Sequence, residues 1–96
     1  MFVAYGFVDL HLPYSHSLKD KRGLLQGVSS RIRKRFYISL AEIDHQELWQ
    51  RSRFGFSAVA KDMATLNLIV NSIRESFENY SDQLEVIDFM CQIVSL

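Results

Sequence analysis

The residues best equipped for chemistry lie in one short segment, residues 42–53, which reads Glu-Ile-Asp-His-Gln-Glu-Leu-Trp-Gln-Arg-Ser-Arg. Carboxylates and imidazole can act as general bases or metal ligands. Arginine can bind phosphate, and tryptophan can stack on an unpaired base. A simple turn needs only formers such as Gly, Pro, Asn or Asp, so this segment is richer than a connector requires.

Catalysis or metal binding would draw on Glu42, Asp44, His45 and His11. In an extended strand, alternation places Glu42 and Asp44 on one face and His45 on the other, unless a bulge intervenes. The sequence has no His-x-x-x-His pair, no second cysteine, no glycine-rich phosphate loop and no nucleophile elbow. We therefore predict no catalytic residue, no metal and no cofactor, and we rank an enzyme below a binding module.

Composition indicates an ordinary globular domain spanning residues 1–96, with 48% hydrophobic and 23% charged residues. No apolar run approaches the roughly 20 residues of a membrane span, and the N-terminus lacks the pattern of a signal peptide. The single cysteine, Cys91, lies in an apolar strand pattern and is interpreted as a small core residue. These features predict a cytoplasmic protein that does not bind membranes.

Charge is unevenly distributed along the chain. Residues 1–53 contain nine bases and five acids, whereas the remaining residues contain two bases and six acids. Such asymmetry indicates either an anionic partner on one side or association between opposite surfaces. A basic cluster at residues 31–35 falls in the last turns expected of a helix. It can stabilise the helix dipole or form a binding patch.

The pattern predicts four strands and two helices. Strands are expected at residues 2–12, 37–45, 54–61 and 84–96, because apolar residues alternate there or occupy both faces. Residues 46–53 are expected to form a hairpin loop. The helices are expected to begin at Ser17 and Asp62, which are good N-caps. Gly23 and Gly27 lie inside the first helix, and close packing on the sheet would explain them.

The order β-α-β-β-α-β predicts a ferredoxin-like α+β sandwich: an antiparallel four-stranded sheet with two helices on one face. In this topology the first and second strands run in the same direction, so their ends meet the start of the first helix at one edge. His11 and His16 are expected there as well. We predict that the same edge binds a partner or RNA through Ser17, Lys19, Lys21, Arg22, Asp44, His45, Gln46, Trp49, Gln50 and Arg51. In the structural alternative, Asp44 and His45 hydrogen-bond the loop and Trp49 packs into the end of the core.

Phe54-Gly55-Phe56 is similar to the aromatic motif with which RNA-recognition sheets stack bases. However, Phe54 and Phe56 belong to the more apolar side of their strand and are expected under the helices. The opposite face of the sheet carries Val3, Tyr5 and Phe7. An apolar face of this kind is usually covered by a partner, so we expect a homodimer formed through it.

Two blocks, Ser17-Leu18-Lys19-Asp20-Lys21-Arg22 and the run from Glu42 to Arg51, resemble signatures of the bacterial YlxP-like family of unknown function. The resemblance covers essentially the whole chain and implies a ferredoxin-like fold without an established activity. Genes of that family often lie near those for a translation initiation factor and a ribosome-binding factor. The resemblance therefore implies a role with RNA or a ribosomal subunit. The chain departs from the family pattern at Gly23, Gly27, Phe54 and Phe56.

Overall fold

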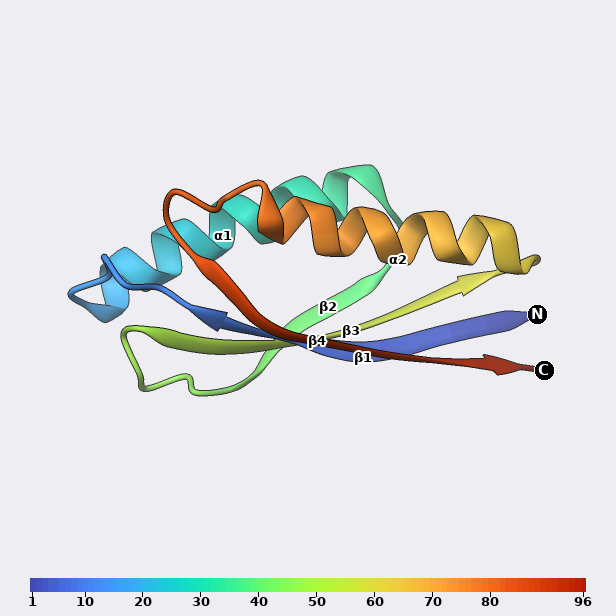
Figure 1. The fold of residues 1–96 in the computed structure, drawn as a ribbon, viewed down its shortest axis with the longest axis horizontal. Helices are drawn as coiled ribbons and strands as arrows, with labels where there is room; N and C mark the ends of the chain where they lie inside the picture. Colours follow the sequence, from blue (N-terminus) through green and yellow to red (C-terminus); the bar gives the residue numbers. More distant parts are fainter.

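The computed structural model describes all 96 residues and contains six elements in the predicted order β-α-β-β-α-β (Figure 1). These elements are β1 (Phe2–His11), α1 (Leu18–Arg35), β2 (Ser39–Asp44), β3 (Arg51–Ala60), α2 (Met63–Glu78) and β4 (Glu85–Ser95). The sheet has the strand order β2-β3-β1-β4, and each neighbouring pair is antiparallel. Both helices cover one face of the sheet. The predicted ferredoxin-like sandwich is therefore confirmed.

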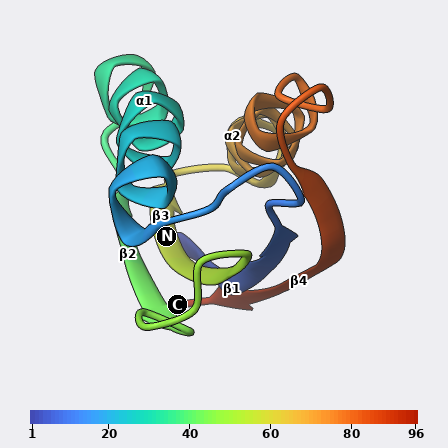
Figure 2. The ribbon, with the colours of Figure 1, turned by 90° about the vertical axis from the view of Figure 1, so that its left-hand side faces the viewer.

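The hydrophobic core fills the space between the sheet and the two helices. Viewed along the strands, α1 lies over the β2 side of the sheet and α2 over the β4 side (Figure 2). Phe54 and Phe56 are only 5% and 4% exposed, as their strand parity predicts. Because both rings are buried, they cannot stack on RNA bases from the surface of the sheet. The other large buried side chains include Leu10, Leu12, Val28, Ile32, Leu66, Ile73 and Phe77.

Both helices begin at the predicted caps. The Ser17 hydroxyl accepts a hydrogen bond from the Asp20 amide at 3.0 Å, and the Asp62 carboxylate accepts one from the Thr65 amide at 2.7 Å. These bonds satisfy amides that have no partner within the helix. The bond from Thr65 also holds the pKa of Asp62 below its ordinary value. Neither helix has the length and apolar character needed to cross a membrane.

The third strand begins earlier than predicted. Arg51, Ser52 and Arg53 were expected in a loop, but they extend β3 opposite His11, Leu10 and Asp9. Polar residues can continue this ladder because their side chains find partners inside the sheet: Arg53 donates two hydrogen bonds to Asp9, both 2.7 Å long. The second strand is shorter than predicted and begins at Ser39.

The explanation expected for the two helical glycines is wrong. Gly23 and Gly27 are exposed on α1 and do not pack on the sheet. A Cβ atom at Gly23 would meet nothing within 4 Å, and one at Gly27 would lie 4.0 Å from the Tyr80 hydroxyl. Both positions therefore have room for a larger side chain on the exposed surface of α1.

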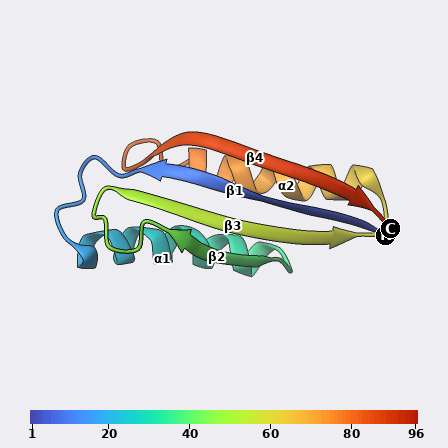
Figure 3. The same ribbon diagram turned by 90° about the horizontal axis from the view of Figure 1, so that it is seen from below.

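The molecule is elongated along its strands, measuring 43 × 21 × 18 Å. Met1 and Leu96 lie together at one end, where the Leu96 amide donates to the Met1 carbonyl at 2.8 Å. The β1–α1 and β2–β3 loops lie at the opposite end (Figure 3). The candidate site therefore occupies the end far from both terminal residues.

Candidate functional site

Two loops meet at the end of the sheet that the sequence singles out. The Leu12 amide donates to the Gln50 carbonyl at 2.9 Å. The Gln50 side-chain amide donates to the carbonyls of Pro13 and Ser15, at 3.3 and 3.1 Å. These bonds attach the β2–β3 loop to the β1–α1 loop. The predicted edge is therefore a continuous surface made by both loops and the start of α1.

A β-bulge separates the two acids that alternation placed together. The β2–β3 register shifts between Glu42 and Asp44, so that Glu42 pairs with Phe54 and Asp44 pairs with Arg53. Glu42 consequently points under the helices, whereas Asp44 follows Arg53 to the uncovered face. The expectation that Glu42 and Asp44 share a face is wrong, and the bulge is the physical reason.

Lys21 is a buried charge. Its side chain is 2% exposed, and its Nζ atom lies 3.0 Å from Glu42 Oε2. It donates to the His45 carbonyl at 2.6 Å and to the Gln46 carbonyl at 3.4 Å. Glu42 Oε2 also accepts a hydrogen bond from the Ser52 hydroxyl at 2.6 Å. This burial contradicts a direct phosphate contact from Lys21, because all of its hydrogen-bonding capacity faces inward.

His45 begins the turn that follows β2. Its φ angle is 64°, a left-handed conformation that few residues other than glycine adopt. The His45 amide donates to Asp44 Oδ1 at 2.7 Å, and the Leu48 amide closes the turn on the His45 carbonyl at 3.0 Å. Asp44 therefore shapes the loop backbone, as the structural alternative expected. Gln46 contributes its backbone carbonyl, and its side chain is exposed.

Trp49 is displayed at the surface. It is 53% exposed, and its neighbour Leu48 is 48% exposed. The alternative in which Trp49 packs into the end of the core is therefore wrong. Around the two side chains lies an open hollow of about 400 Å³, which is also lined by Glu47, Gln50 and Arg51. An exposed tryptophan on an anchored loop is typical of a contact residue.

Two exposed bases, Lys19 and Arg22, lie on the first turns of α1, and neither forms an ion pair. The helix start itself is already capped. The Asp20 carboxylate accepts the His16 amide at 3.1 Å, and Ser17 accepts the Asp20 amide. Because Asp20 places a negative charge there and the amides are already capped, the helix start is a poor site for an RNA phosphate. On these first turns of α1, Lys19 and Arg22 are the cations without an ion-pair partner.

Three of the four bases in the basic cluster at the far end of α1 contact other groups of the protein. Arg31 lies over the Tyr80 ring at 5.6 Å, and Arg35 lies over the Phe36 ring at 5.3 Å. Arg33 donates to the Leu40 carbonyl at 2.5 Å, which joins α1 to β2. These contacts favour the structural interpretation of the cluster over a separate binding patch.

The histidines do not form a common site. His11 Nδ1 lies 3.6 Å from Glu85 Oε2, whereas His45 Nδ1 lies 3.8 Å from Asp44 Oδ1. No three His, Cys, Asp or Glu side chains converge in the arrangement that a metal ion requires. His16 is exposed beside the helix start.

The sequence did not indicate the pairing of Arg53 with Asp9. The guanidinium also lies over the Phe7 ring, 4.0 Å from its centroid. The hydrogen bonds from Arg53 hold the pKa of Asp9 below its ordinary value, despite the burial of this carboxylate. The pair therefore stays ionised on the uncovered face of the sheet. Only the register of β1 and β3 brings these two residues together.

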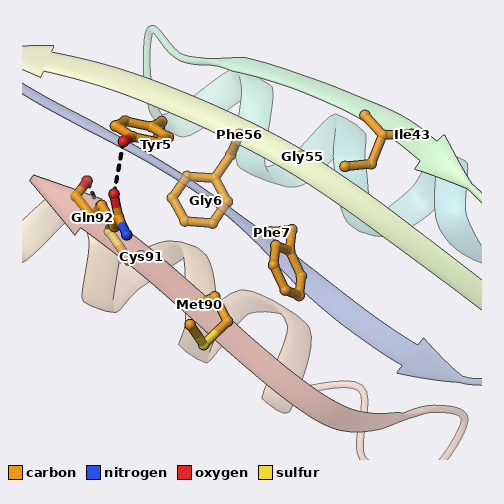
Figure 4. A pocket seen from close by; sticks show the side chains of 9 residues that line it. All are labelled: Tyr5, Gly6, Phe7, Ile43, Gly55, Phe56, Met90, Cys91 and Gln92. Atoms are coloured by element: carbon orange, nitrogen blue, oxygen red, sulfur yellow. Dashed lines mark hydrogen bonds between the residues drawn. The ribbon is translucent and has the colours of Figure 1, made fainter.

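That uncovered face contains an apolar groove of about 440 Å³ (Figure 4). Tyr5 and Phe7 line it, as their strand pattern indicated, and the Tyr5 hydroxyl donates to Gln92 at 2.7 Å. Met90 of β4 and Ile43 of β2 also line the groove. Because β4 has apolar residues on both of its sides, its sequence pattern did not reveal that Met90 faces the groove. Cys91 packs against the core, and its burial raises the pKa of its thiol, which makes it less reactive.

Comparison with a solved structure supports the fold. A Deinococcus radiodurans protein, described as a candidate antibiotic biosynthesis monooxygenase, superposes with a TM-score of 0.58. The alignment covers 100% of this chain and 92% of the other, at 10% sequence identity. At this identity the likeness shows the shared ferredoxin-like fold and nothing about activity.

Comparison of sequences identifies the family. The uncharacterized protein YlxP of Bacillus subtilis (strain 168) is 43% identical over 44 residues, which span 46% of this chain and 48% of that protein. The match thus spans about half the length of each protein. The profile of the family described as "Protein of unknown function (DUF503)" matches residues 3–91. The chain therefore belongs to the DUF503 family.

Proposed function

We propose that this protein is a non-enzymatic cytoplasmic binding module for RNA, either free or within a ribosomal subunit. The observation that carries the proposal is the exposure of Trp49 on a loop attached to the β1–α1 loop, which leads into the first turns of α1, where Lys19 and Arg22 are also exposed. We define these three residues as the contact surface.

The chemistry of the contact surface suits a single-stranded nucleic acid. A tryptophan face can stack on a base of any sequence, and stacking contributes roughly 1–3 kcal/mol per base. Lysine and arginine supply the phosphate contacts that dominate affinity and make it dependent on salt. The charge of α1 also favours a polyanion, because this helix contains seven bases and one acid.

The test is binding to total RNA and to ribosomal subunits over a range of salt concentrations. We expect Lys19→Ala/Arg22→Ala to weaken binding and to flatten the salt dependence by a slope of about 1.4, since each contact to a single strand contributes about 0.7. We expect Trp49→Ala to weaken binding without changing the slope. Lys61→Ala/Arg74→Ala, which removes equal charge near and on α2, is the matched control.

The absence of RNA binding by the wild type at low salt would overturn the proposal. Equal losses in the contact-surface double variant and the control would also overturn it, because they would indicate a general effect of net charge.

A second candidate function, a homodimeric interaction module, is favoured by the apolar groove on the uncovered sheet face. Tyr5, Met90 and Val94 are 46%, 49% and 40% exposed there. We expect the wild type to have the mass of a dimer by light scattering and Met90→Lys to be monomeric. Leu68→Lys, at an exposed apolar position on α2, is the control and should remain dimeric. A monomeric wild type at high concentration would exclude this candidate.

A further inference from the structure

We propose that Lys21 is the positioning residue of the contact surface. Its buried ammonium group holds the β2–β3 loop in the conformation that presents Trp49, and it touches no partner itself. The inference about affinity rests on the proposed function, whereas the inference about the loop can be tested in its absence.

The surroundings of the ammonium group support this role. A lysine ammonium group has three donors, and Nζ faces three oxygens: Glu42 Oε2 at 3.0 Å, the His45 carbonyl at 2.6 Å and the Gln46 carbonyl at 3.4 Å. The first oxygen belongs to β2 and the other two belong to the loop. Lys21 thereby connects α1 to the last residues of β2 and to the first residues of the loop.

The loop needs such a connection at this position. The left-handed backbone of His45 is intrinsically unfavourable, and such a conformation persists only when its surroundings over-determine it. The His45 carbonyl accepts hydrogen bonds from Lys21 Nζ and from the Leu48 amide. The same oxygen therefore attaches the loop to α1 and closes the turn. Releasing the ammonium would leave the turn with a single bond on that carbonyl.

A second attachment holds the other end of the loop. Gln50 is tied to Pro13, Ser15 and Leu12 through its side chain and its carbonyl. Trp49 precedes Gln50 and has no hydrogen bond of its own to the rest of the protein. Its direction is therefore set by the two attachments together. Loss of the Lys21 attachment would leave the loop hinged at Gln50.

Trp49 is the only tryptophan in the chain, so its fluorescence reports on this loop alone. In Lys21→Met we expect lower fluorescence anisotropy and at least a twofold larger acrylamide quenching constant than in the wild type. Lys19→Met changes the same residue type on the exposed side of the same helix, and it should leave both values unchanged. Equal quenching and anisotropy in Lys21→Met and the wild type would overturn the inference, because Gln50 would then be a sufficient anchor.

RNA affinity and its salt dependence separate positioning from direct contact. If only a tenth of the molecules keep the loop in its presenting conformation, affinity falls about tenfold. We expect this loss in Lys21→Met with an unchanged salt slope. A slope flatter by about 0.7 would instead make Lys21 a phosphate contact and overturn the inference. If the wild type does not bind RNA, the proposed function fails, and the fluorescence result alone decides the role of Lys21.

Loss of Lys21 alone leaves the Glu42 carboxylate without its buried partner, which can unfold the chain. The double variant Lys21→Met/Glu42→Met removes both charges and retains the volume of the cluster. Far-ultraviolet circular dichroism identifies which variant is folded, and the fluorescence comparison is made on that variant. A folded double variant with wild-type quenching and anisotropy would overturn the inference equally.

Discussion

At the scale of residues, two charged pairs lie on opposite faces of one sheet. Lys21 and Glu42 lie on the helix-covered face, and Asp9 and Arg53 lie on the uncovered face. Asp9 is 6% exposed, so it loses most of its water on folding. Its charge is tolerated because Arg53 binds both carboxylate oxygens. Removing one member of either pair should lower the free energy of unfolding more than replacing both members with apolar residues.

The Asp9 pair predicts an acid-sensitive contribution to stability. Because Arg53 lowers the pKa of Asp9 in the folded state, the pair stabilises the fold above the ordinary aspartate pKa of about 4. This contribution disappears as pH falls from that value through the lowered pKa. We expect urea midpoints of the wild type to fall more steeply below about pH 4 than those of Asp9→Asn/Arg53→Met. Parallel pH profiles would contradict the prediction.

The left-handed residue His45 allows a second prediction at this scale. Glycine adopts this conformation without the Cβ clash, which costs other residues about 1–2 kcal/mol. The extra freedom of glycine in the unfolded chain offsets part of that gain. We expect His45→Gly to be at least as stable as the wild type, and His45→Val to be less stable by about 1 kcal/mol or more. Chemical denaturation measures both values, and equal stability of the two variants would contradict the expectation.

Sequence patterns could not distinguish Lys21 from Lys19, or a packed Trp49 from a displayed one. Lys21 lies at the helix position that faces the end of β2, but the bulge after Glu42 decides which carboxylate and carbonyls it meets. The residue types thus predicted where the surface lies. Whether Lys19 or Lys21 is exposed at this surface depends on the β-bulge after Glu42, which has no sequence signature.

At the scale of elements, α1 can be made more stable by substitution at two exposed glycines. Gly23 and Gly27 are exposed, and a Cβ atom fits at either position. Alanine in a helix interior is favoured over glycine by about 1 kcal/mol. We therefore expect Gly23→Ala and Gly27→Ala to raise the melting temperature by several degrees each, measured by circular dichroism. Unchanged or lower values would contradict the prediction.

Retained RNA affinity in these alanine variants would show that the glycine surface of α1 is free in the complex. A loss of affinity together with higher stability would place the partner's surface directly against these glycines.

The boundary of β3 shows why element ends are harder to predict than element types. Arg51, Ser52 and Arg53 have the composition of a loop, yet each pairs with β1. What keeps them in the sheet is a set of partners from distant parts of the chain, namely Asp9 for Arg53 and Glu42 for Ser52. The alternation of Phe54, Phe56 and Ala58 predicted the buried side of this strand because that pattern is local.

At the scale of the whole molecule, the contact surface and the apolar groove do not compete for space. The groove lies on the sheet face opposite the helices. Lys19 and Arg22 belong to the first turns of α1, and Trp49 belongs to the β2–β3 loop. Figure 3 shows this loop and the start of α1 at the same end of the molecule. A dimer formed through the sheet would therefore carry two free contact surfaces. Two linked surfaces bind a long RNA more tightly than one.

This arrangement predicts a dependence of affinity on RNA length. We expect Met90→Lys to bind a short oligonucleotide like Leu68→Lys, but to bind total RNA at least tenfold more weakly because it lacks the second contact surface. Both variants add one positive charge, so the comparison isolates the dimer. Equal affinity of the two variants for long RNA would contradict the prediction.

The topology could be predicted as a whole because its signals are redundant. Six elements with clear periodicity, Ser17 and Asp62 as caps, and Pro13 after β1 all agree on one architecture. The Asp9–Arg53 pair and the choice of which β4 side chains face the groove could not be predicted, because they depend on the register and twist of the sheet.

The hydrogen bond between Leu96 and Met1 holds the first and last residues of the chain side by side. A linker of a few residues could join these two ends, and the backbone could then be cut at residues 79–83, between α2 and β4. Such a circular permutant would keep every strand pairing and would change only the order in which the elements emerge during synthesis. A tether at either original end would also leave the contact surface facing away from a support.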